Sequence, residues 1–228
     1  MATFVLVHGA WAGGWMWRTV ARELRAAGHE AFTPTLTGLG ERVHLANPAI
    51  DLDTHILDVV NLLRFERLEH VVLVGHSFAG LVISGVADRV PASIGRLVYL
   101  DALVPRDGES GADLLGRARA GFFVRAAKYR GDGWRVPARL DGPEGERLTD
   151  MPLKPGLQRL TLRDAAARAL PRTFVLFTAK PAHDVLRPVM RRMAARARRA
   201  GWDYRELPIE HGRDEGAEAV ARLLLELA

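Results

Sequence analysis

A chain of 228 residues, 48% hydrophobic and 26% charged, has the composition of a globular protein with one core, which excludes a disordered chain and a fibre. The absence of cysteine excludes disulfides, thiolate metal sites and a cysteine nucleophile. The net charge of +5 raises the question of a nucleic-acid partner, which the distribution of the arginines answers below.

Apolar runs and amphipathic segments alternate over the first 104 residues. We predict strands over residues 3–7, 30–34, 71–74 and 94–100, and helices over residues 15–27, 53–63 and 78–87. Strands that alternate with helices are typical of a parallel sheet with helices on both faces. The sequence therefore predicts a doubly wound α/β fold.

Residues 105–170 break this rhythm, because they carry many glycines, isolated charged clusters and only short helical patterns, such as 113–127 and 163–170. We interpret them as a lid or cap inserted into a single domain whose core is residues 1–104 and 171–228. The core then resumes with strands 173–177 and 203–207 and helices 185–200 and 217–227. The complete sheet has about six strands, and the lid precedes the last two.

Arginines gather in residues 187–199, where they alternate with Ala and Met at helical spacing. No aromatic residues or nucleic-acid motif accompany them, so we interpret this stretch as a solvated helix rather than a phosphate-binding face. No stretch reaches about 18 consecutive apolar residues, and no basic region with a cleavage site opens the chain. We therefore expect a cytoplasmic protein with no nucleic-acid or membrane partner.

A serine stands between a buried strand and a helix, in the pattern of a nucleophile elbow. Val71–Val74 and Gly75 lead to Ser77, and a helical pattern follows at once. The turn accepts only small side chains two residues on either side of the serine. Gly75 meets this demand, whereas Ala79 stands where a second glycine is usual and Gly80 comes one residue late.

A serine needs a base, an acid that orients the base, and donors for an oxyanion. His211 follows the last predicted strand, where a base is expected. Chain order favours Asp184 as the acid, and Asp101, at the end of strand 94–100, is the alternative. The expected oxyanion donors are the N–H groups of Phe78 and Ala10. His8 and His76 are histidines beside this site, and we expect them to support its turns.

Five segments carry a family resemblance: Val5–Trp11, Pro34–Arg42, Leu52–Ile56, Val71–Gly80 and Leu97–Ala102. Together they resemble the bacterial esterases of the pyrethroid-hydrolase type, which are similar to the plant methylesterase and hydroxynitrile-lyase family. The resemblance implies an α/β-hydrolase fold. It is dense over residues 3–107, faint in the lid and moderate from residue 170 onward. Gly9 and Gly212 stand where hydroxynitrile lyases carry threonine and lysine, which favours ester cleavage.

The sequence thus predicts a cofactor-independent serine hydrolase, without a metal, that cleaves a carboxylic ester of a small apolar molecule through an acyl-enzyme on Ser77. One alternative is elimination, cyclisation or acyl transfer on a biosynthetic intermediate by the same residues. Another is a binding protein that keeps the pocket without catalysis. The sequence does not identify the substrate, and it leaves a homodimer open.

Overall fold

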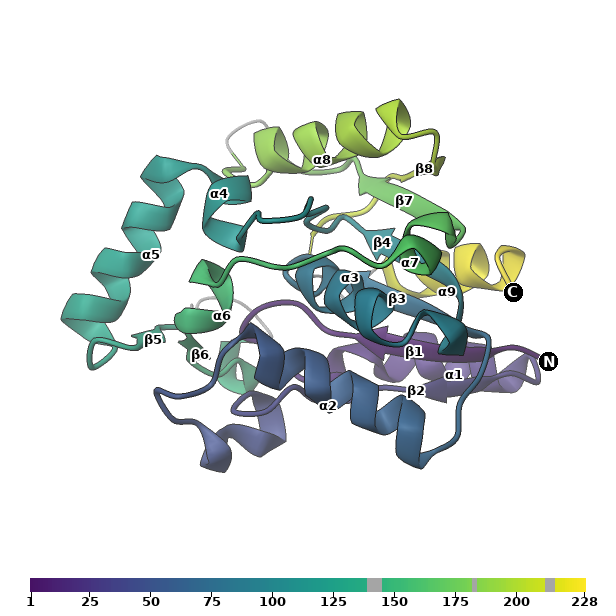
Figure 1. Cartoon of the computed structure of the whole chain (residues 1–228), viewed down its shortest axis with the longest axis horizontal. Coiled ribbons are helices and arrows are strands. Elements are labelled where there is room, and N and C mark those ends of the chain that lie inside the picture. Colours follow the sequence, from purple (N-terminus) through teal and green to yellow (C-terminus); the bar gives the residue numbers. More distant parts are fainter. Residues whose placement is uncertain (139–144, 182–183, 212–215) are drawn as a thin grey trace.

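The computed structural model describes residues 1–138, 145–181, 184–211 and 216–228. One parallel sheet lies at its centre, in the strand order β2-β1-β3-β4-β7-β8 (Figure 1). Its strands are β1 (Thr3–Val7), β2 (Glu30–Phe32), β3 (Val71–His76), β4 (Ile94–Leu100), β7 (Arg172–Phe177) and β8 (Asp203–Leu207). The predicted sheet of about six strands is confirmed, and β3 lies inside it between β1 and β4.

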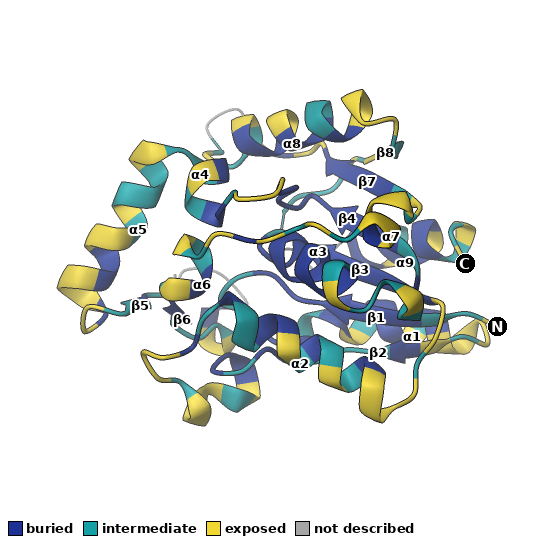
Figure 2. Ribbon diagram, in the orientation of Figure 1, coloured by how far each residue is buried: buried dark blue, intermediate teal, exposed yellow. Residues whose placement is uncertain are grey.

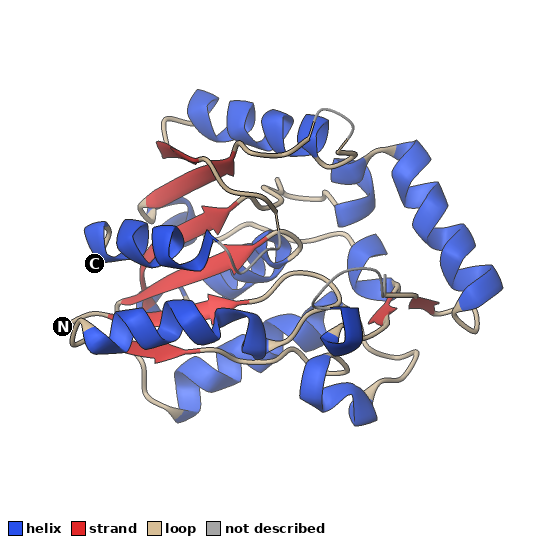
Figure 3. Cartoon of the chain, turned by 180° about the vertical axis from the view of Figure 1, so that it is seen from behind, coloured by secondary structure: helices blue, strands red, loops and turns tan. Residues whose placement is uncertain are grey.

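Helices cover both faces of this sheet. One face packs against α1 (Arg18–Ala26) and α9 (Ala217–Glu226), which lie in front of the sheet in Figure 3. The other face packs against α2 (Leu52–Phe65), α3 (Ala79–Arg89) and α8 (Arg187–Arg199). Across the described ranges, no helix has the length and apolar character needed to cross a membrane.

The central strand β3 is buried along its whole length (Figure 2). Its side chains alternate between the two cores: Val71 and Leu73 pack toward α2 and α3, and Val72 and Val74 pack toward α1 and α9. A strand covered on both faces needs apolar residues at every position rather than at alternate positions. This explains the unbroken apolar run that precedes the serine.

Residues 105–170 leave the main sheet after β4 and return at β7. They form α4 (Gly111–Leu115), α5 (Arg117–Arg130), β5 (Arg135–Val136), η4 (Gly145–Arg147), β6 (Met151–Pro152), α6 (Lys154–Leu157) and α7 (Ala165–Ala169). The single helix predicted over 113–127 is wrong, because Gly116 adopts φ 88° and separates α4 from α5. This left-handed conformation is accessible to glycine at little cost and ends the first helix.

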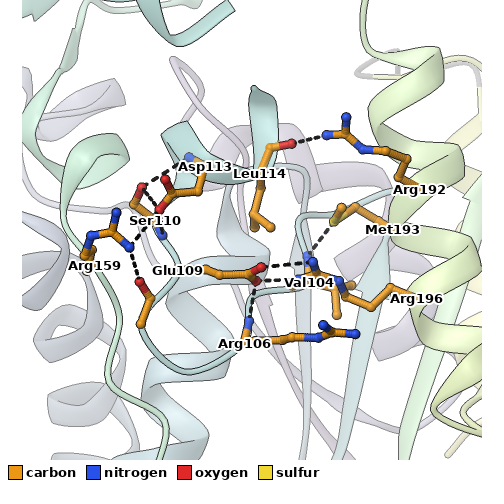
Figure 4. Close-up of polar contacts among 11 residues, drawn as sticks. Val104, Arg106, Glu109, Ser110, Asp113, Leu114, Arg159, Arg192, Met193 and Arg196 are labelled. Carbon is orange, nitrogen blue, oxygen red and sulfur yellow. Dashed lines mark hydrogen bonds and ion pairs between the residues drawn. The ribbon is translucent and has the colours of Figure 1, made fainter. Parts of the chain in front are cut away.

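The start of this insertion is bound to α8 (Figure 4). Arg196 donates to the Val104 carbonyl oxygen at 2.7 Å and to Glu109 Oε1 at 3.0 Å, and Arg192 donates to the Leu114 carbonyl oxygen. The view of α8 as a helix whose cations only meet water is therefore incomplete. Its outer face is exposed, whereas Arg196 is half-buried and ties the insertion to the core.

Candidate active site

The serine lies on a sharp turn between β3 and α3. Ser77 adopts φ 56°, a left-handed conformation that is costly for a residue with a Cβ atom. Two backbone hydrogen bonds stabilise it: the Ser77 N–H donates to the Leu100 carbonyl oxygen at 3.2 Å, and the Leu103 N–H donates to the Ser77 carbonyl oxygen at 2.9 Å. The segment after β4 therefore holds the predicted elbow in its strained shape.

Close backbone contacts explain the small residues around the turn. A Cβ atom on Gly75 would lie 2.9 Å from the Ala79 carbonyl oxygen, and one on Gly80 would lie 1.9 Å from the Leu103 carbonyl oxygen. The Ala79 methyl group is itself fully buried within the core. The glycine that comes one residue late is thus required by the loop after β4.

Replacing Gly80 by alanine should therefore destabilise the protein by about 2 kcal/mol or more, because the α3 backbone must move away from Leu103. Urea unfolding with intrinsic tryptophan fluorescence measures this change. The matched variant Ala79→Gly removes a methyl group and adds chain entropy, at a cost of about 1 kcal/mol. If the two variants were equally stable, the Leu103 contact would not limit this position.

A chain of hydrogen bonds joins the serine to a buried carboxylate. His211, in the segment after β8, places Nε2 2.9 Å from Ser77 Oγ. Its Nδ1 lies 2.5 Å from Asp101 Oδ2. Asp101 directly follows β4 and is fully buried, with φ 45°. The sequence-based pairing of Ser77 with His211 is thus present in the structure.

The preference for Asp184 as the orienting acid is corrected by these contacts. Asp184 lies before α8, where its Oδ1 accepts a hydrogen bond from the Leu186 N–H at 2.7 Å. The sheet explains why Asp101 takes the place instead. His76 pairs with Leu100 in the register of β3 and β4, so the residues that follow them emerge side by side at the same sheet edge.

A lysine that the sequence analysis did not consider lies behind the carboxylate. Lys180, in the loop after β7, is 5% exposed and donates from Nζ to Asp101 Oδ1 at 2.7 Å. The Phe177 N–H donates to the same oxygen at 3.2 Å. The one hint in the sequence was a charged residue directly after an apolar strand, which is also typical of a surface loop.

Two buried histidines flank the site. The His8 Nδ1–H donates to the Gly9 carbonyl oxygen at 2.8 Å, and Nε2 accepts from the Leu36 N–H at 3.0 Å. Burial lowers the pKa of His8 to about 4. The His76 ring lies 4.4 Å from the His211 ring, centroid to centroid, and stacks on Phe177. Burial likewise lowers the pKa of His76 well below its usual value, so both side chains are neutral at pH 7.

The buried His76 ring should make stability depend on pH. Its nitrogens have no hydrogen-bond partner among the described residues. Because its pKa is depressed in the folded chain, the unfolded chain binds more protons below about pH 6.5, and stability is lost as the pH falls. The slope from this one residue is at most about 1.4 kcal/mol per pH unit.

His76→Phe should therefore unfold with a shallower pH dependence than the wild type. Urea midpoints at pH 7.5, 6.5 and 5.5 measure the difference. The exposed His44, changed to glutamine, is the control and should leave the slope unaltered. Equal slopes for the wild type and His76→Phe would contradict the neutral, buried state of His76.

A pocket of about 330 Å³ opens over Ser77 and His211. Its lining is largely apolar and comes from the first turn, α1, α9 and the insertion: Gly9, Ala10, Trp11, Trp15, Met16, Arg147, Leu148, Leu186, Ile209 and Val220 are among the residues. The Arg147 guanidinium lies 3.9 Å from the centre of the Trp15 ring. The pocket can therefore take a small apolar molecule next to the serine hydroxyl.

The two expected oxyanion donors lie next to this pocket in the chain. Ala10 lines the pocket and Phe78 follows the serine, and neither N–H group has an acceptor among the described residues. Trp11, with φ 64°, holds the first turn against the insertion, since its carbonyl oxygen accepts from the Thr149 N–H at 2.9 Å. Within the described ranges, no group of three or more metal-ligating side chains occurs. Gly212 lies outside the described residues.

Residues 4–221 match the model of the alpha/beta hydrolase family. The chain belongs to this family. The fold and the resemblance predicted from the sequence are thereby confirmed.

Other members of the alpha/beta hydrolase family are similar over part or all of the chain. A carbendazim-hydrolysing esterase from Nocardioides sp. is 55% identical over 118 residues, which are 52% of this chain and 49% of that protein. The putative methylesterase 14 of Arabidopsis thaliana is 33% identical over 113 residues, 49% of this chain and 32% of that protein. The chain thus spans half or less of these relatives. The crystal structure of a pyrethroid hydrolase from Sphingobium faniae superposes with a TM-score of 0.76 at 18% identity, covering 99% of this chain and 96% of that one.

Proposed function

We propose that the protein is a serine hydrolase that cleaves a carboxylic ester of a small apolar molecule through an acyl-enzyme on Ser77. The observation that carries the proposal is the hydrogen-bonded series from Ser77 through His211 to Asp101. This is the arrangement that activates a serine hydroxyl, and it opens into an apolar pocket. Relatives named as esterases support the same reaction class.

In the proposed first step, Ser77 Oγ attacks the ester carbonyl carbon while its proton passes to His211 Nε2. Asp101 accepts the Nδ1–H of His211, which keeps the ring in the tautomer that presents Nε2 to the serine. The carbonyl oxygen becomes an oxyanion, which the N–H groups of Phe78 and Ala10 stabilise. Each such donor contributes about two to three powers of ten in turnover.

The tetrahedral intermediate then expels the alcohol, which takes its proton from His211 Nε2. A water molecule enters, gives a proton to the same nitrogen and attacks the acyl carbon, and Ser77 leaves as the free hydroxyl. No cofactor takes part in these steps. Residues 105–170 act as a lid in this proposal, because Arg147 and Leu148 from that insertion line the pocket beside the serine.

The test combines covalent labelling with a series of esters. We expect a fluorophosphonate to modify Ser77, identified by mass spectrometry of the labelled peptide, and p-nitrophenyl esters with short or aromatic acyl groups to be hydrolysed. Labelling of Ser77 without cleavage of any ester would favour elimination, cyclisation or acyl transfer. Absence of both, together with tight binding of a small apolar molecule, would favour a binding protein and contradict the proposal.

A further inference from the structure

Lys180 has an environment unusual for a lysine. Its side chain is 2% exposed, and the Asp101 side chain that it contacts is 0% exposed. Lysine is almost never fully buried unless it is paired, because removing an ammonium group from water is costly. Besides Asp101, the Nζ group donates to the Phe177 carbonyl oxygen at 2.5 Å. Its hydrogen bonds therefore fix the ammonium against the end of β7.

The two carboxylate oxygens of Asp101 have separate partners. Oδ1 accepts from Lys180 Nζ and from the Phe177 N–H, whereas Oδ2 faces His211. With Oδ1 held at two points, the carboxylate cannot rotate without breaking a charge-assisted hydrogen bond. Lys180 therefore sets the direction from which Oδ2 meets the imidazole.

The charges around His211 come from several segments. Asp101 follows β4 and Lys180 follows β7, while Glu210 precedes His211 in the chain and Arg147 from the insertion lines the same pocket. His76, at the end of β3, stacks on the imidazole as a neutral ring, since burial lowers its pKa. Among the described residues, Lys180 is the cation that shares the carboxylate of His211.

We propose, building on the hydrolase function above, that Lys180 is a positioning residue that orients Asp101 and whose charge opposes the protonation of His211. One carboxylate then serves two partners. Without Lys180, the negative charge of Asp101 would act on His211 alone and favour the imidazolium. With Lys180 present, the imidazole remains a free base that can accept the serine proton at neutral pH.

The experiment replaces Lys180 by methionine, which has similar length but no charge and no donor. We expect the acid limb of the pH profile of kcat/KM to move to higher pH by about one unit or more. At pH 7 the loss should be about tenfold or more, and at pH 9 the activity should recover toward that of the wild type. A merely structural role would lower activity at every pH without moving the limb.

A second readout does not depend on turnover. In NMR spectra of histidine-labelled protein, the titration midpoint of the His211 imidazole should rise in Lys180→Met by a similar amount. If the wild type neither hydrolyses esters nor reacts with a fluorophosphonate, the hydrolase function fails, and this midpoint alone still decides the role of Lys180. An unmoved or lowered midpoint would overturn the proposal.

The chain offers a matched control and a rescue. Lys154 pairs with Asp51 at the surface, and Lys154→Met should leave the limb and the midpoint where they are in the wild type. Because the protein has no cysteine, Lys180→Cys can be alkylated at a single site with 2-bromoethylamine in the unfolded state and refolded. The resulting aminoethyl side chain restores an ammonium group and should return the limb to its wild-type position.

Loss of Lys180 leaves a buried carboxylate, so Lys180→Met can fail to fold. In that case Lys180→Gln, which keeps an N–H donor for Asp101 without the charge, takes its place. The same upward movement of limb and midpoint is expected, because the proposal assigns that effect to the charge. A folded Lys180→Gln protein with a wild-type profile would overturn it.

Discussion

Replacing Ser77 by alanine is expected to lower the turnover of a p-nitrophenyl ester by at least about four powers of ten. The substitution removes the atom that forms the acyl-enzyme, and the 2.9 Å contact with His211 Nε2 is lost with it. Binding should survive, because the apolar walls of the pocket remain in place. Stopped-flow kinetics should show neither a burst nor a steady state above the rate in buffer.

The fold of Ser77→Ala should be intact, so that the lost activity reports chemistry alone. Alanine and serine bear a similar cost at φ 56°, and the free energy of unfolding should change by less than about 1 kcal/mol. Ser93, at the opposite end of the sheet before β4, gives the control Ser93→Ala, which should retain full activity. Turnover by Ser77→Ala within tenfold of the wild type would exclude Ser77 as the nucleophile.

Local patterns were sufficient to predict the frame of this site. The unbroken apolar run of Val71–Val74 predicts a strand buried on both faces, and the structure places β3 in the middle of the sheet. The small residues around Ser77 predict the elbow, because the backbone contacts that require them lie within a few residues of the turn, apart from the one with Leu103. The elements of the core were predictable for the same reason.

The partners of His211 could not be predicted with the same certainty, since they depend on which strands are neighbours. The chain order of the residues favoured Asp184, whereas the register of β3 with β4 brings Asp101 beside Ser77. Lys180 illustrates the same limit. Its burial results from a carboxylate 79 positions earlier in the chain, and no local pattern around it indicates that contact.

The insertion was the least predictable segment for a related reason. Its short helices are specified by contacts with distant parts of the chain, such as those of Arg196 with Val104 and Glu109, rather than by a long apolar stripe. A single glycine, Gly116, decides where α4 ends and α5 begins. Composition alone indicated only that these residues lie outside the sheet.

Comparing Asp101→Asn with Asp184→Asn should separate the two acids by about four powers of ten. Asparagine tolerates the left-handed conformation at position 101, so the backbone can stay in place. With the amide oxygen accepting from Lys180 and the Phe177 N–H, the amide NH2 group faces His211 Nδ1, which must then accept. The imidazole proton moves to Nε2, and that nitrogen can no longer take the proton of Ser77.

Asp184→Asn should keep turnover within about twofold of the wild type, because its carboxylate serves the Leu186 N–H and an amide oxygen can replace it there. Asp101→Asn has a second effect, since Lys180 then lies buried without a counter-charge. We expect it to lose about 3 kcal/mol of stability, measured by urea unfolding. The double variant Asp101→Asn with Lys180→Met removes that buried charge and should regain most of the stability. Its turnover should stay as low as that of Asp101→Asn, because the tautomer of His211 is still wrong, and recovery of activity along with stability would show that Asp101 acts on the fold rather than on the base.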